Sequence, residues 1–250
     1  MSFSYDNEKE EMILLYPVGT NEEDTMAAFK QIGNVVILGS YEQDNNLDNG
    51  KEPIEWIVLD VQNGKSMLIT KYMIELKNYY PQQKRDWDKF VPTWEKSDLR
   101  NWLNKDFYNL AFTNNEQNVI LDTKVDNSKK QGNSEARHGY RYISIEDGIN
   151  TTDKIFILSY AEAWHYLDTK GRAGEYTDYA GYLSMLDSVE NYDSTDMRIR
   201  KEGSWLLRSP GESSRTLLWV WYNGELTQSA ISTMAGIRPA LWVDLSKSIY

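Results

Sequence analysis

The sequence predicts an α+β fold with a mostly antiparallel sheet, two or three helices and long irregular loops. Strand patterns occur in both the N-terminal and the C-terminal parts of the chain, and capped helical segments lie between them. That segregation favours an antiparallel sheet over alternating βα units. Aromatic residues make up 13% of the chain, with 9 Trp and 17 Tyr. Large rings dominate burial, so the chain can build a core despite its polar average.

The first strands are expected before residue 71. Residues 34–38 are a strand candidate that is apolar after Asn34. In residues 54–61, apolar side chains fall on both faces of the expected strand, as in a strand covered on both sides. Asn63-Gly64 is a two-residue hairpin signal, and residues 65–70 return as the partner strand. The region therefore predicts a β-meander.

Three helices are predicted from their capping residues. Ser97 precedes apolar residues at helical spacing and has an acidic residue after it in the first turn. Thr113 and Glu116 have the spacing of a capping box, and so do Ser159 and Glu162. Each pair predicts a helix start at its first residue.

Two polar stretches, 126–150 and 170–201, are expected to be long loops, which are often functional in compact domains. No repeat and no Pro- or Ser-rich linker divides the chain. The sequence thus predicts an acidic lead-in segment at 1–31 and one domain at 32–250. The C-terminal part returns to strands with a turn at Asn223-Gly224, and we expect these strands at 205–208, 217–222, 225–228 and 237–243.

The formal charge of −11 comes from 38 acidic and 27 basic residues. Such a field repels phosphate backbones, so no nucleic-acid partner is expected. No apolar run approaches the length of a membrane helix, so no membrane insertion is expected. The start of the chain has no signal-peptide pattern, which predicts a cytoplasmic location as written, or a cell-surface or secreted one if a leader was removed.

Cysteine is absent, which excludes disulfides, zinc–thiolate sites and cysteine nucleophiles. The two histidines, His138 and His165, match no metal-binding or nucleophile motif. No catalytic residue and no cofactor are therefore assigned. Any two of the 38 acids could still converge as the carboxylate pair of a glycoside-type hydrolase, and that alternative stays open.

One acidic stretch has the oxygen spacing of a calcium loop. Asp44, Asn46 and Asp48 alternate, and Glu55 follows Asp44 by eleven positions. The loop requires glycine where Asn49 stands, and Glu55 falls within a predicted strand. A polar turn explains the same residues, so no metal is predicted, and calcium near Asp44–Asp48 stays an open question.

The C-terminal strands gather tryptophans and arginines. Trp205, Trp242, Arg208 and Arg238 are expected to belong to the core, with the two arginines paired to buried carboxylates. Strand alternation places Trp219 and Trp221 on one face. Tryptophan, tyrosine and arginine are the favoured anchors of binding surfaces, so the predicted ligand-binding residues are Arg215, Trp219, Trp221, Tyr222 and Asn223.

Six motifs in order between about residues 33 and 243 resemble a bacterial family of uncharacterised domains. They are Gly39-Ser-Tyr-Glu, Ile54-Glu-Trp-Ile-Val-Leu, Trp94-Glu-x-Ser-x-Leu-Arg-x-Trp-Leu-Asn, Asp153-Lys-Ile-Phe-Ile-Leu-Ser-x-x-Glu, Trp205-Leu-Leu-Arg-Ser-Pro-Gly and Gly236-Ile-Arg-Pro-Ala-Leu-Trp.

The Ser204-Trp205 strand and Gly236-Ile-Arg238 are also similar, more distantly, to the C-type-lectin-like fold of formylglycine-generating enzymes and of retroelement variable proteins. The chain lacks the cysteines of those enzymes, the histidine-rich iron motif of the related sulfoxide synthases and the calcium motifs of sugar-binding lectins. The resemblance therefore implies a fold and no chemistry.

We expect a non-catalytic binding module that contacts its ligand through residues 205–228 and 170–201. Stacking aromatics beside polar groups suit a carbohydrate, and they suit a protein or peptide equally. The alternatives are the carboxylate-pair hydrolase and a structural domain of a larger assembly. The oligomeric state is not predicted.

Overall fold

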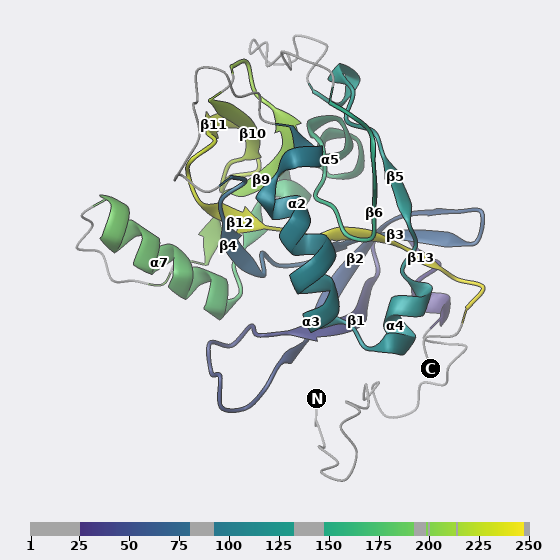
Figure 1. The fold of residues 1–250 in the computed structure, drawn as a ribbon. Helices are drawn as coiled ribbons and strands as arrows, with labels where there is room; N and C mark the ends of the chain where they lie inside the picture. Colours follow the sequence, from purple (N-terminus) through teal and green to yellow (C-terminus); the bar gives the residue numbers. More distant parts are fainter. Residues whose placement is uncertain are drawn as a thin grey trace.

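The computed structural model describes residues 26–80, 93–132, 148–192, 199, 201–213 and 215–247. These residues form a mixed α+β fold with mostly antiparallel sheets and long loops, as the sequence predicts (Figure 1). His138 and residues 1–25 of the predicted lead-in segment lie outside the described residues.

The first sheet joins the opening meander to the last strand of the chain. Its strands follow the order β1-β2-β3-β13, and all neighbours are antiparallel. Asn63 and Gly64 make the β2–β3 turn with φ values of 50° and 72°, the positive values that a two-residue hairpin turn requires. The strands are β1 (Val35–Tyr41), β2 (Glu52–Gln62), β3 (Lys65–Thr70) and β13 (Ala240–Asp244).

The second sheet follows the order β11-β10-β9-β12-β4, in which only the β12–β9 pair is parallel. The strand predicted at 237–243 is divided between the two sheets, because Pro239 lacks the amide that a continuous strand needs. The strands are β4 (Glu75–Lys77), β9 (Trp205–Pro210), β10 (Thr216–Val220), β11 (Leu226–Ala230) and β12 (Ala235–Ile237). Two further sheets have two strands each. One is formed by β5 (Thr123–Val125) and β6 (Thr151–Asp153), and the other by β7 (Gly174–Glu175) and β8 (Glu202–Gly203).

The three predicted helix caps are confirmed. Ser97 accepts the Arg100 amide, and both predicted capping boxes are formed. The described residues contain six α-helices rather than two or three: α2 (Asp98–Trp102), α3 (Tyr108–Ala111), α4 (Asn114–Val119), α5 (Tyr160–Tyr166), α6 (Thr169–Arg172) and α7 (Asp178–Tyr192). A π-helical turn, η2 (Leu103–Phe107), joins α2 to α3, and two 3-10 turns are η1 (Trp94–Lys96) and η3 (Lys129–Gln131).

The prediction of an irregular loop at 170–201 is wrong. This stretch contains α6, β7 and the longest described helix, α7, which packs against β4 (Figure 1). Ala180, Gly181 and Met185 are buried. Glycine, serine and aspartate lie between the few large apolar residues of α7. Its apolar face therefore contrasts weakly with the rest of the helix, and the helical period could not be recognised in the sequence.

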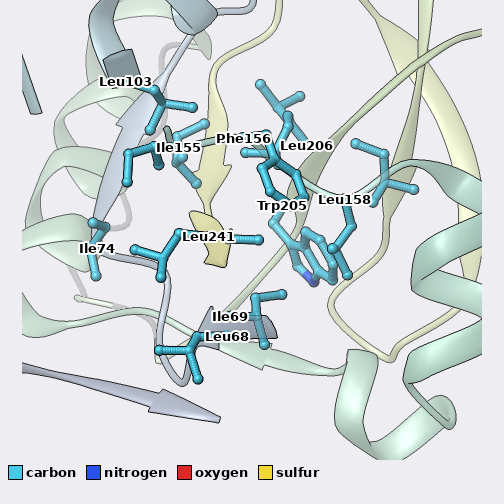
Figure 2. Close-up of a cluster of buried hydrophobic side chains, with 14 of the residues drawn as sticks. Leu68, Ile69, Ile74, Leu103, Ile155, Phe156, Leu158, Trp205, Leu206 and Leu241 are labelled. Carbon is cyan, nitrogen blue, oxygen red and sulfur yellow. The ribbon is translucent and has the colours of Figure 1, made fainter. Parts of the chain in front are cut away.

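The core is one cluster of buried side chains that joins both sheets. In Figure 2, Leu68 and Ile69 from β3 lie near Trp205 from β9, with the segment around Phe156 beside them. Trp205 is fully buried, as predicted, whereas Trp242 is only partly buried against the cluster.

Arg208 pairs with a carboxylate, as the sequence predicts, although that carboxylate is half-buried rather than buried. Its guanidinium is 1% exposed and makes a bidentate ion pair with Glu162, at 2.7 Å for Nη2 to Oε1. Its other N–H groups donate to the Asn127 side chain and to the carbonyl oxygens of Ile157 and Asp126. All five N–H donors of the guanidinium are therefore used.

Arg238 does not pair with a carboxylate, contrary to the prediction. Within the described part of the chain, its guanidinium donates to the carbonyl oxygens of Thr70 and Gly171 at 3.1 Å each. It also lies 5.0 Å from the Trp205 ring centre, a cation–π contact. Burial lowers the pKa of Arg238 to about 10, so the group keeps its charge at neutral pH.

The turn between β10 and β11 is seated on α6. Arg172 of α6 donates to the Gly224 carbonyl at 2.9 Å. Gly224 has a φ of 84°, and a Cβ atom there would clash with the Thr169 carbonyl oxygen. Both the backbone conformation and the close approach to α6 therefore require glycine.

We predict that Glu162→Gln lowers the free energy of unfolding by about 3 kcal/mol, because it leaves a buried guanidinium without its counter-charge. The variant keeps an acceptor for the helix cap. The matched control is Glu55→Gln, whose partner Lys71 is 35% exposed. That change should cost less than about 1 kcal/mol. Chemical denaturation measures both, and equal losses would contradict the role given to Arg208.

We predict that Gly224→Ala lowers the free energy of unfolding by about 2–4 kcal/mol, since strain and a clash with Thr169 act together. Gly33→Ala is the control, because Gly33 has a φ of 88° and open space where a Cβ would lie. It should cost about 1–2 kcal/mol, the strain alone. Denaturant melts of both variants give the comparison, and a Gly224→Ala loss no larger than the control would refute the close packing on α6.

Candidate functional site

The predicted ligand-binding residues do not form one site. Arg215 stands before β10 and Trp221 after it, so the two lie at opposite ends of the strand, about 20 Å apart along an extended chain. Trp219 lies between them and is buried, with 6% of its surface exposed. The exposed Trp221 ring and the buried Trp219 ring therefore do not share one contact surface, and Arg215 stands at the opposite end of β10 from Trp221.

The side chains of Trp219 and Trp221 have different surroundings. A tight turn follows β10 at once, because the Trp221 carbonyl accepts the Gly224 amide at 2.8 Å and the Trp221 amide donates to the Glu225 carbonyl at 2.7 Å. Trp221 has 45% of its surface exposed, whereas Trp219 is buried with 6% exposed. The expectation that the two side chains share one face of the sheet stays a prediction.

Three of the predicted residues remain together, and we call Trp221, Tyr222 and Asn223 the aromatic turn. The ring centres of Trp221 and Tyr222 are 6.0 Å apart at an interplanar angle of 54°. Tyr222 is 54% exposed, so both rings offer large open faces. The Asn223 side-chain oxygen accepts the Glu225 amide at 3.1 Å, which fixes the turn.

Sequence reasoning missed the residue that supports the aromatic turn from α6. Arg172 is buried, donates to Gly224 and to the Leu167 carbonyl, and lies 5.1 Å from the ring centre of Trp164. Burial lowers the pKa of Arg172, while Tyr160 and Asp168 act in the opposite direction. No sequence signal marks Arg172, because it lies in a stretch predicted to be a loop.

The buried carboxylates are engaged in contacts that hold the fold. Glu75 accepts the Tyr41 hydroxyl at 2.8 Å, and Glu116 accepts the Gly39 amide at 2.7 Å. Asp153 pairs with Arg100 and accepts the indole N–H of Trp94. These contacts give the hydrolase alternative no free acidic pair among these three carboxylates.

The loop between β1 and β2 brings together a different acidic set from the one that spacing indicated. Carboxylate oxygens of Glu42, Asp44 and Glu52 lie within 4.8 Å of one another. Glu55 instead lies in β2 and pairs with Lys71 at 3.1 Å. Burial and the neighbouring Glu52 raise the pKa of Glu42.

Backbone amides account for this acidic loop without a metal. Glu52 accepts the Gln43 amide at 2.7 Å, and the Asn46 amide donates to both Glu42 and Asp44. Asn45 adopts a φ of 62°, as in a tight polar turn. The loop has the character of the polar turn that the sequence predicts, so no metal is assigned to it.

His165 is exposed on α5, and its ring meets that of Tyr166 edge-on at 4.7 Å between centres. This arrangement is that of a surface histidine. Within the described ranges, no helix combines the length and apolar character needed to cross a membrane.

Comparison with known proteins gives a family and no activity. The model of a family described as a domain of unknown function, DUF6273, matches residues 63–245, which are 183 of the 250 residues. No curated protein and no solved structure matches the chain. The matched region runs from the β2–β3 turn to the end of β13 and includes the aromatic turn. The chain therefore belongs to the DUF6273 family of domains of unknown function.

Proposed function

We propose that this chain is a non-catalytic ligand-binding module whose contact surface is the aromatic turn, and that its ligand is a carbohydrate or a protein segment. The observation that carries the proposal is the pair of neighbouring rings, Trp221 and Tyr222, which are 45% and 54% exposed. Such rings are the favoured anchors of binding surfaces.

The support beneath the aromatic turn favours binding, since a rigid surface loses little entropy when a ligand binds. Gly224 touches α6, and the buried Arg172 holds its carbonyl. Asn223 closes the turn through its own side chain. The rings therefore project from a backbone that is already fixed.

The size of the surface sets the expected affinity. Half-exposed Trp and Tyr rings together offer on the order of 200 Å² of apolar area, worth about 5 kcal/mol before the costs of association. A single contact of this size corresponds to a Kd of about 0.1–1 mM or weaker. The ligand is accordingly expected to be repeated or extended, so that several contacts add up.

We propose that residues 32–250 form one domain of C-type-lectin-like fold from a bacterial protein. The motifs at Trp205 and Gly236 support that fold, and the hydrophobic cluster of the described residues, which joins the two sheets, supports one domain. An isolated 32–250 fragment that melts in one cooperative transition would support the domain boundary.

The test is a glycan array probed with multivalent full-length protein, once with calcium and once with chelator. We predict that Trp221→Ala and Tyr222→Ala each reduce binding by about 10-fold or more, because each removes a central ring. Leu110→Ala is the control, since Leu110 is 51% exposed on α3, away from the aromatic turn.

Leu110→Ala should bind like the unchanged protein. Binding that needs calcium would draw attention to the acidic loop at Glu42, Asp44 and Glu52. No binding to any glycan in either condition would reject the carbohydrate version and leave the protein ligand, and binding that survives loss of both rings would reject the aromatic turn as the site.

A further inference from the structure

Three asparagines of the chain are followed directly by glycine, at Asn49-Gly50, Asn63-Gly64 and Asn223-Gly224. Asparagine in this sequence deamidates most readily, because glycine has no side chain beside the backbone nitrogen that attacks the asparagine amide. All three asparagines are exposed. Since the following residue is the same in each, differences in their reactivity come mainly from the surrounding structure.

The pair Asn49-Gly50 lies in the loop between β1 and β2, which projects from the edge of the first sheet (Figure 1). Both residues are exposed, and a Cβ atom at Gly50 would meet no atom within 4 Å. Among the described residues, no group accepts a hydrogen bond from the Gly50 amide. The Asn49 side chain donates to the exposed Asp44 carboxylate at 2.7 Å. Because an exposed bond of this kind exchanges with water at little cost, the Gly50 nitrogen and the Asn49 side chain can approach each other.

The pair Asn223-Gly224 is held by the packing of the aromatic turn. Gly224 is buried, its amide donates to the Trp221 carbonyl at 2.8 Å, and its carbonyl accepts Arg172 at 2.9 Å. The Asn223 side-chain oxygen accepts the Glu225 amide at 3.1 Å. The attacking nitrogen and the side chain that it would attack are therefore both fixed.

The pair Asn63-Gly64 is held by the β2–β3 hairpin. Gln62 pairs with Lys65 across the turn, and the Gly64 carbonyl accepts the Leu245 amide at 2.8 Å. To bring the Gly64 nitrogen onto the Asn63 side chain, the peptide plane between these two residues has to rotate. That rotation disturbs the paired ends of both strands, so the reaction requires a local opening of the hairpin.

We propose that Asn49 is a modification site at which the folded chain deamidates, while the fold protects Asn63 and Asn223. The Gly50 amide nitrogen loses its proton and attacks Cγ of Asn49. The bond from Cγ to the side-chain nitrogen breaks, and that nitrogen leaves as ammonia with the proton. A water molecule then opens the cyclic imide, which gives aspartate or, when the main chain passes through the side-chain carbonyl, isoaspartate.

The reaction changes the acidic loop and leaves the aromatic turn intact. At neutral pH the product is a carboxylate, and Asp44 loses the NH₂ donor that Asn49 provides. Carboxylate oxygens of Glu42, Asp44 and Glu52 already lie within 4.8 Å of one another, so the loop gains a further like charge. This site does not depend on the proposed binding function.

Peptide mass spectrometry of the full chain tests the proposal, because replacement of NH₂ by OH changes the mass of the peptide that contains it. The chain is incubated at mildly alkaline pH, folded in one sample and unfolded in urea in another, and both are then digested at acidic pH. We predict that folding slows the reaction of Asn49 by less than about 10-fold. Folding should slow Asn63 and Asn223 at least about 10 times more than Asn49, since protected groups react only through opening.

Asn49→Gln is the control variant, because the longer glutamine side chain forms its ring far more slowly. This variant should keep the Tm and the rates of Asn63 and Asn223, and its loop peptide should no longer gain mass.

Three outcomes would overturn the proposal. The first is a slowing of Asn49 by more than about 10-fold on folding, and the second is a slowing of Asn63 or Asn223 that is less than about 10 times that of Asn49. The third is a loop peptide that still gains mass in Asn49→Gln, since Asn45 or Asn46 would then be the reacting residue.

Discussion

The buried guanidinium of Arg208 is the interaction on which the arrangement of the C-terminal sheet depends. It joins β9 to Glu162 of α5, 46 positions earlier in the chain, and to the carbonyl of Asp126, 82 positions earlier. Because a buried charge without its partner is strongly destabilising, β9, α5 and the segment at 126–127 have to be in place together.

Two further buried arginines, Arg238 and Arg172, connect the first sheet to the aromatic turn. Arg238 links Thr70 of β3 to Gly171 of α6 and stacks on Trp205. The Trp205 indole donates to the Arg172 carbonyl at 2.9 Å, and Arg172 holds Gly224. Carbonyl dipoles compensate a cation less fully than a carboxylate does, which agrees with the lowered pKa of Arg238. The exposed rings therefore rest on a continuous path of buried contacts.

Local sequence signals predicted those helix starts and turns that depend on residues close together in the chain. Ser97, Thr113 and Ser159 cap helices because a side chain and a backbone amide three residues away suffice. Asn63-Gly64 makes its hairpin for the same reason. Long-range packing decided the rest. α7 has too weak an apolar contrast to be recognised, and the carbonyl partners of Arg238 come from segments 168 and 67 positions away.

In the candidate site, too, the features that depend on long-range packing could not be predicted from the sequence. Exposure of Trp221 depends on β10 ending at Val220, and burial of Trp219 depends on its neighbours Leu206 and Thr227 in the sheet. Neither fact is encoded in the run of aromatic residues itself.

An irregularity in one strand pair accounts for the contacts that Arg208 makes outside its own sheet. The register of β9 against β10 shifts between the Leu217–Pro210 and Trp219–Leu206 pairs, which is the mark of a bulge. The Arg208 amide bonds to the Leu158 carbonyl rather than to β10. The Arg208 side chain turns toward the segment at 126–127, where it donates to the Asn127 side chain and to the Asp126 carbonyl. The bulge therefore leaves both the backbone amide and the side chain of Arg208 available for contacts outside the sheet.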